Sequence, residues 1–144
     1  MHPGVLHVVI VHLPIGITIA ALAADALWVL TKRPLFKSAA AYCLVAALIT
    51  AVPTVILGEF RADEMNATGD LANLIDSHEA AGVTTLCLLA GATVTRLVTH
   101  KWPKKWLFVA YTLIMVALFV AVILAGEFGG EIVYGKGFLK ELFM

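Results

Sequence analysis

Residues 106–126 read WLFVAYTLIMVALFVAVILAG, a run that holds no charged side chain. A helix of about 20 mostly apolar residues crosses the hydrocarbon core of a bilayer, which is about 30 Å thick. Residues 5–31, 38–59 and 78–99 are similarly long and largely apolar. The sequence therefore predicts an all-α integral membrane protein, folded as a four-transmembrane-helix bundle.

The composition leaves little room for a soluble domain. Of the 144 residues, 61% are hydrophobic and 14% are charged, whereas soluble domains are about 45–50% apolar and about 25% charged. We expect one membrane domain over 1–144, with 127–144 as a tail against the outer surface. The formal net charge is zero, so nothing in it favours nucleic acid. Cys43 and Cys87 lie in apolar runs, where cysteine usually packs as a small hydrophobic residue.

The connections between the spans differ in charge. Those after the first and third spans are basic, whereas the connection 61–77 carries four carboxylates against Arg61. Because basic residues favour the cytoplasmic side, we predict that both termini lie outside (N-out/C-out). Asp76 and Glu79 have the spacing of a capping box, which predicts that the third helix opens there.

The two halves of the chain carry similar motifs. His12 is followed four residues later by Gly16, and His78 is followed four residues later by Gly82. The second and fourth spans both end in an apolar segment that contains Gly-Glu-Phe. This predicts two duplicated helical hairpins related by a pseudo-twofold axis along the membrane normal. That axis would place His12 and His78 at the same depth.

Histidine is costly within a membrane helix and marks a functional site by default. A glycine one turn beyond each histidine would let a flat ligand approach the backbone. The pattern favours a haem b with His12 and His78 as axial ligands of the iron and with Gly16 and Gly82 making room. His7 is a further candidate, although it points about 140° away from His12 on an ideal helix.

Two other interpretations stay open. Glu59 and Glu127 end their helices near the height of the histidines. They could accept hydrogen bonds from the haem ligands, or they could join the histidines in a non-haem metal site. In the third interpretation the protein is a cofactor-free structural membrane subunit whose histidines reach headgroups or water.

Two further charges lie inside the spans. Asp25 is in the first span and Arg96 is at a similar level in the third. Because an ion pair is cheaper in lipid than two lone charges, we expect the two side chains to pair across the bundle in a structural role.

The stretch HVVIVHLPI at 7–15 resembles the opening signature of a bacterial family of small predicted membrane proteins, domain of unknown function 2231. That signature reads His-Pro-x-x-Val-His-Phe-Pro-Ile. The family also has an aspartate later in the first helix, a histidine opening the third span and a closing Gly-Gly-x-Leu-Val-Tyr segment. These are matched by Asp25, His78 and GGEIVY at 129–134.

The resemblance covers nearly the whole chain, with two departures. Val8 stands where the family usually has proline, and Lys136 stands where a histidine often follows the tyrosine. Family members are sometimes fused to Rieske or cytochrome c domains, which implies a setting of electron transfer. The resemblance implies a bacterial inner membrane as the location. Because little of the chain lies outside the spans, we expect a small subunit or partner of a redox assembly instead of a stand-alone enzyme. Its implied partners are a periplasmic cytochrome or Rieske-type protein, or quinol, in a homo- or hetero-oligomer.

Overall fold

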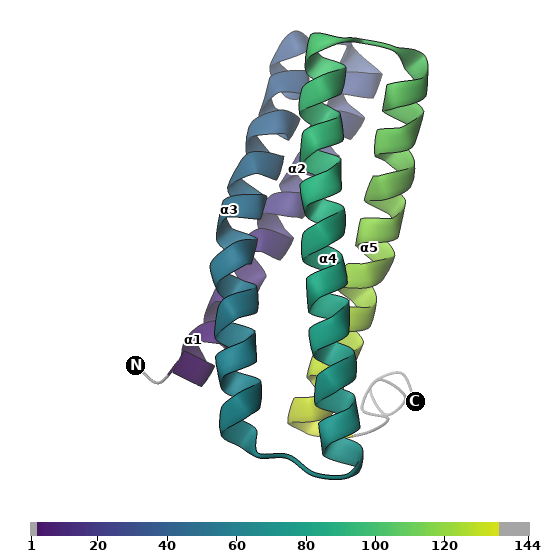
Figure 1. Ribbon diagram of the computed structural model, residues 1–144. Coiled ribbons are helices and arrows are strands. Elements are labelled where there is room, and N and C mark those ends of the chain that lie inside the picture. The colour runs from purple at the N-terminus through teal and green to yellow at the C-terminus, as the bar shows by residue number, and fades with distance from the viewer. Residues whose placement is uncertain (1–2, 136–144) are drawn as a thin grey trace, which may run out of the picture.

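The computed structural model describes residues 3–135, with side chains described from residue 6 onward. All regular structure in this range is helical (Figure 1). The helices are α1 (Pro3–Ile10), α2 (His12–Thr31), α3 (Pro34–Met65), α4 (Asp70–Lys101) and α5 (Lys105–Tyr134). The segment Leu6–Thr31 and the helices α3, α4 and α5 are each long and apolar enough to cross a membrane. The predicted four-helix membrane bundle is therefore confirmed.

The helices form two hairpins that stand side by side (Figure 1). One consists of α1 and α2 packed against α3, and the other consists of α4 packed against α5. The connections within the hairpins lie at one end of the bundle, which we call the turn end. The described chain ends and the α3–α4 connection lie at the opposite end, the terminal end. This matches the predicted hairpin topology, and the orientation in the membrane stays a prediction.

The two helix boundaries at the α3–α4 connection differ from those predicted. Because α3 continues to Met65 and α4 begins at Asp70, most of the expected loop 61–77 is helical. The predicted capping box at Asp76 was wrong, since that residue lies inside α4. Several residues at these helix ends, such as Arg61, Glu64 and Leu71, are good helix formers, which favours continuation of the helices beyond the apolar runs.

The tail was predicted to begin at residue 127, which is too early. Helix α5 runs on to Tyr134, so residues 127–134 are helical instead of turning across the outer surface. The chain leaves the helix at Gly135, whose φ of 92° favours glycine. The remaining tail, 136–144, including Lys136, lies outside the described residues.

A proline breaks the first span in two. Pro14 has no backbone N–H to give to the carbonyl of Ile10, and its ring crowds that carbonyl. Helix α1 ends at Ile10, where the N–H of Val11 donates to the carbonyl of His7 at 2.9 Å. Before this break α1 packs against α3. The face that α1 buries against α3 therefore does not have to continue the face that α2 buries.

Small residues bring the helices close together in the middle of the bundle. Ala21, Ala47 and Ala92 are fully buried, and larger side chains such as Leu44 and Leu118 fill the remaining space. Such close approach is how membrane helices associate, because lipid supplies no hydrophobic force between them. The centre of the bundle is consequently apolar and tightly packed.

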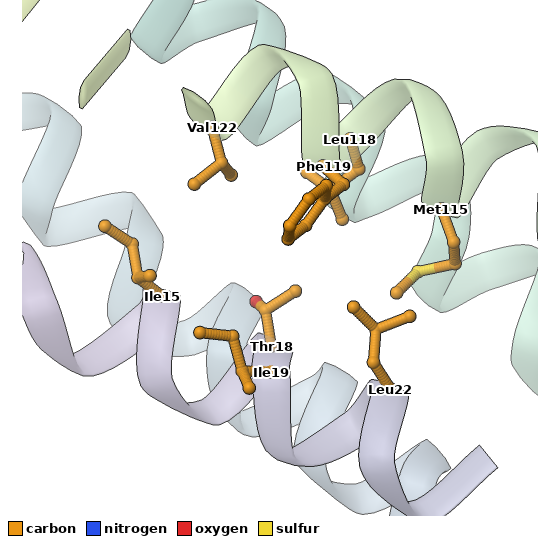
Figure 2. Close-up of a pocket in the computed structure, with 8 residues that line it drawn as sticks. All are labelled: Ile15, Thr18, Ile19, Leu22, Met115, Leu118, Phe119 and Val122. Carbon is orange, nitrogen blue, oxygen red and sulfur yellow. The ribbon is translucent and has the colours of Figure 1, made fainter. Parts of the chain in front are cut away.

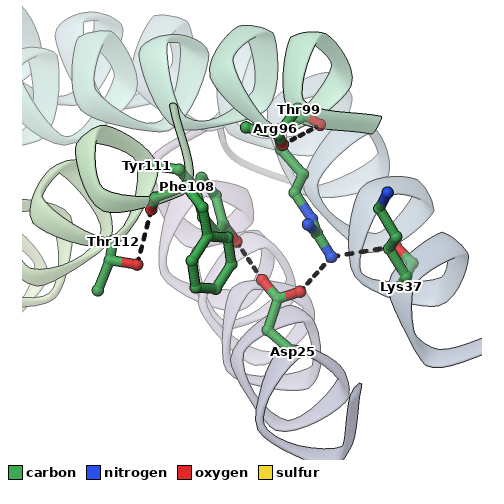
Figure 3. A network of polar contacts seen from close by, with 7 residues as sticks. All are labelled: Asp25, Lys37, Arg96, Thr99, Phe108, Tyr111 and Thr112. Carbon is green, nitrogen blue, oxygen red and sulfur yellow. Dashed lines mark hydrogen bonds and ion pairs between the residues drawn. The ribbon is translucent and has the colours of Figure 1, made fainter. Parts of the chain in front are cut away.

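A charged network crosses the bundle near its turn end (Figure 3). Arg96 in α4 forms a buried ion pair with Asp25 in α2, so the predicted pairing is confirmed. The hydroxyl of Tyr111 in α5 donates to Asp25 Oδ2 at 2.5 Å, and Arg96 Nη2 donates to the carbonyl of Lys37 in α3 at 3.2 Å. This one network joins all four spans.

The ion pair predicts a large stability effect at Asp25. Asp25→Asn removes the charge that compensates Arg96, which is only 1% exposed. We expect the free energy of unfolding to fall by about 3–5 kcal/mol, as when one partner of a buried pair is removed. The measurement is unfolding in detergent micelles followed by circular dichroism. Asp63→Asn, at an exposed position, is the control, and equal losses in the two variants would contradict this account.

Candidate functional site: a histidine pair at the terminal end

Two histidines make the same contact in the two hairpins. Nδ1 of His7 lies 2.9 Å from the carbonyl oxygen of Thr54, and Nδ1 of His78 lies 2.9 Å from that of Ala125. A carbonyl oxygen only accepts hydrogen bonds, so each Nδ1 carries the proton and donates it. In the neutral imidazole this leaves Nε2 with a free lone pair. Both rings are thus prepared to act as acceptors or metal ligands through Nε2.

The two rings also meet each other. The ring centroids of His7 and His78 are 6.3 Å apart and the rings are perpendicular, with an interplanar angle of 89°. Since His7 is in α1 and His78 is in α4, the contact joins the two hairpins. Both side chains are half-buried.

A glycine lies directly against each ring. A Cβ added to Gly58 would lie 3.0 Å from Cε1 and 3.3 Å from Nδ1 of His7. A Cβ added to Gly129 would lie at the same two distances from the corresponding atoms of His78. Any larger residue would push the ring away, so the absence of a side chain is what lets each imidazole reach its carbonyl.

These contacts define the register of the internal repeat. The corresponding residues are 7 and 78, 54 and 125, and 58 and 129, a constant separation of 71 residues. Asp25 and Arg96 are separated by the same 71 residues. The predicted pairing of His12 with His78 used a separation five residues too short, and the structure brings His7 against His78 instead.

His12 lies on another face of the first span. Its side chain is exposed, and its Nδ1 lies 3.0 Å from the carbonyl oxygen of Val8 in the same span. The physical reason is the five-residue spacing, which turns His12 away once His7 faces the bundle. Gly16 and Gly82 do not line the histidine pair, since a Cβ added to either would meet nothing within 4 Å.

The glutamates do not join the histidines. Glu59 and Glu127 are both exposed, and backbone carbonyls take the place of the acceptors predicted at Nδ1. Within the described part of the chain, no group of three or more His, Cys, Asp or Glu side chains is arranged to hold a metal ion. The predicted non-haem site of two histidines and two glutamates is therefore not assembled.

An apolar groove lies elsewhere, between α2 and α5 (Figure 2). Near the turn end α2 and α5 meet through the Tyr111–Asp25 hydrogen bond and the ring contact of Trp28 with Phe108. The groove between them has a cavity volume of about 30 Å³ and runs along Ile15–Leu22 of α2, two turns or more beyond His7. It does not provide room beside the histidine pair.

The fold and the site together define an integral membrane protein of two equivalent hairpins, with paired imidazoles at the terminal end. The chain belongs to the family of predicted membrane proteins DUF2231, whose model matches residues 2–140. No match was found among the curated proteins or among the solved structures. The family suggested by the sequence is thus confirmed.

The glycine contacts predict matched effects of one added methyl group. Gly58→Ala and Gly129→Ala place a Cβ against a histidine ring, and we expect each to lower the free energy of unfolding by about 1–3 kcal/mol, as overpacking does. Gly16→Ala and Gly82→Ala are the controls. They should be neutral or stabilising by up to about 1 kcal/mol, because alanine favours helix. Nitrogen-15 NMR should show loss of the protonated Nδ1 signal in the first pair, and equal behaviour of both pairs would rule out the described contact.

Proposed function

We propose that the protein is a membrane electron-transfer protein, a b-type cytochrome in which His7 and His78 ligate the iron of one haem. The matched hydrogen bonds from Nδ1 to Thr54 and Ala125 carry this proposal. A ligating histidine typically donates its other ring N–H to a carbonyl or carboxylate, which fixes the tautomer and the ring orientation. Both histidines have that arrangement, and both keep Nε2 for a metal.

The spacing of the rings also fits a shared metal. A metal ion held by both imidazoles would keep the ring centroids roughly 6 Å apart, since a metal–imidazole bond is about 2 Å long. The observed separation is 6.3 Å. One metal centre could therefore be held by the two histidines with little change in the distance between the hairpins.

Each residue of the site has a distinct task in this proposal. A haem iron would supply a one-electron couple at this position. The carbonyls of Thr54 and Ala125 orient the rings, and Gly58 and Gly129 let the rings approach the backbone. With the predicted orientation the site lies near the periplasmic face, where a periplasmic cytochrome, a Rieske-type protein or quinol is the proposed partner.

One observation favours a second candidate, a metal ion without a porphyrin. The rings meet edge to face, and the groove between α2 and α5 does not extend to them. A bare copper or zinc ion needs less space than a haem, and imidazole suits both metals. The same two histidines would then bind the ion directly.

Absorption spectroscopy tests the proposal. The protein is expressed with a haem precursor, purified in detergent and measured in oxidised and dithionite-reduced forms. We expect a Soret band that His7→Ala or His78→Ala removes, because each variant deletes one of the two ligands. His12→Ala is the matched control, since His12 lies in the same span but faces away, and it should keep the wild-type spectrum.

Elemental analysis of the same samples separates the candidates. If the wild-type protein contains stoichiometric copper or zinc but shows no Soret band, and both ligand variants lose that metal, the bare ion is the correct candidate instead of the haem. Wild-type protein free of haem and metal would overturn both candidates in favour of the cofactor-free subunit. Loss of the spectrum in His12→Ala to the same degree as in His7→Ala would overturn the ligand assignment.

A further inference from the structure

Three cations gather around one tryptophan at the turn end of the bundle. The Nζ atoms of Lys32 and Lys37 each lie 5.9 Å from the centroid of the Trp28 ring, and Cζ of Arg96 lies 5.3 Å from it. Among the described residues, Asp25 is the carboxylate in contact with this group, and both its oxygens are engaged by Arg96 and Tyr111. The cluster therefore carries positive charge in excess of its partner.

Arg96 keeps unused hydrogen-bond donors within the cluster. Its Nε and Nη1 are buried and have no hydrogen-bond partner in the described part of the chain. Its Nη2 donates to the carbonyl of Lys37, which places the guanidinium against the first turn of α3 (Figure 3). Buried donors without partners cost free energy, so an added acceptor here would be favourable.

The start of α3 adds further positive charge at the same place. This helix begins at Pro34, and its N-cap residue Arg33 makes no side-chain capping hydrogen bond. Pro34 has no N–H, and the N–H of Phe36 donates to the carbonyl of Arg33 at 3.2 Å, so the start of α3 contributes mainly the partial positive charge of a helix N-terminus, which attracts anions. The helix terminus, the lysines and the buried arginine thus converge on one place.

We propose that a phosphate group binds here, against Lys32, Lys37 and the first turn of α3, with Arg96 behind them. Basic pockets between membrane helices bind anionic headgroups, and Trp28 suits the level of the membrane interface. The phosphate belongs either to an anionic phospholipid or to free inorganic phosphate. The site is separate from the histidine pair and does not depend on any metal.

The second hairpin supplies a matched control. The N-cap residue of α5, Lys104, also makes no side-chain capping hydrogen bond. Nζ of Lys101 lies 4.8 Å from the centroid of the Trp102 ring. In the 71-residue register, however, the position equivalent to Arg96 is Asp25, a carboxylate. The α4–α5 turn thus has a similar charge, but its equivalent of the buried arginine is acidic.

Tryptophan fluorescence tests the site in the full chain. A Trp102→Phe/Trp106→Phe background leaves Trp28 as the sole tryptophan, since the sequence has three. The detergent-solubilised protein is titrated with phosphatidylglycerol, with phosphatidylcholine and with inorganic phosphate. We expect a saturable change with phosphatidylglycerol. Lys32→Gln/Lys37→Gln should weaken it by about tenfold or more because both lysines lie at the Trp28 ring, whereas Lys104→Gln/Lys105→Gln should change it by less than about threefold.

The titrations also distinguish the source of the phosphate. Saturation by phosphatidylglycerol that millimolar phosphate does not displace identifies the lipid, and saturation by inorganic phosphate identifies the free ion. Equal weakening by the two lysine pairs would overturn the proposal, because it would indicate general surface attraction. Absence of a saturable response to both ligands would also overturn it. Circular dichroism confirms that each variant is folded before the comparison.

Discussion

The ion pair between Asp25 and Arg96 is the interaction on which the arrangement of the two hairpins depends. In a bilayer no hydrophobic force distinguishes one sliding position of two helices from another, so packing and polar contacts must specify it. This pair joins α2 of one hairpin to α4 of the other, deep in the bundle. Shifting either hairpin by one turn would leave two buried charges without partners. The pair thereby also fixes which residues meet at the terminal end.

The repeat gives the two ends different chemistry at equivalent positions. At the terminal end the equivalent residues are identical, His7 and His78, and each donates to a backbone carbonyl of its own hairpin. At the turn end they are complementary, Asp25 and Arg96, and they bind each other. Because their charges are opposite, Asp25 and Arg96 bind each other directly. Two identical imidazoles cannot satisfy each other through two free Nε2 atoms, since both are acceptors. A ligand shared between them, such as the proposed metal centre, would use both lone pairs.

Sequence analysis predicted the spans, the hairpin topology, the Asp25–Arg96 pair and the place of His78 in the third span. It aligned the halves on their His-x-x-x-Gly motifs, with His12 opposite His78 at a separation of 66 residues, and on their Gly-Glu-Phe segments, with Gly58 opposite Gly126 at a separation of 68. The structural register is 71, almost one helical turn more, and it makes Gly129 the counterpart of Gly58. The first residues of α3 and α5, Pro34 and Lys105, are also 71 apart.

Two features of the site had no side-chain signal to reveal them. The acceptors at Thr54 and Ala125 are backbone carbonyls, which every residue possesses, so their use depends on helix packing. The choice of His7 over His12 depends on the break at Pro14, which sets the face of α1 apart from that of α2. A proline indicates where a helix bends, but the direction of the bend follows from what the freed segment packs against. Here that is the backbone of Gly58.

An apolar layer separates the two polar ends of the bundle. Ala21 and Ala92 are fully buried between them, and no polar side chain bridges this layer in the described residues. The hydroxyl of Thr18 donates to a carbonyl of its own helix at 2.8 Å, and that of Thr93 donates to a carbonyl of its own helix at 2.7 Å and to the carbonyl of Leu44 in α3 at 3.4 Å. The proposed metal centre and the proposed phosphate site lie on opposite sides of this layer, so each can be tested without disturbing the other.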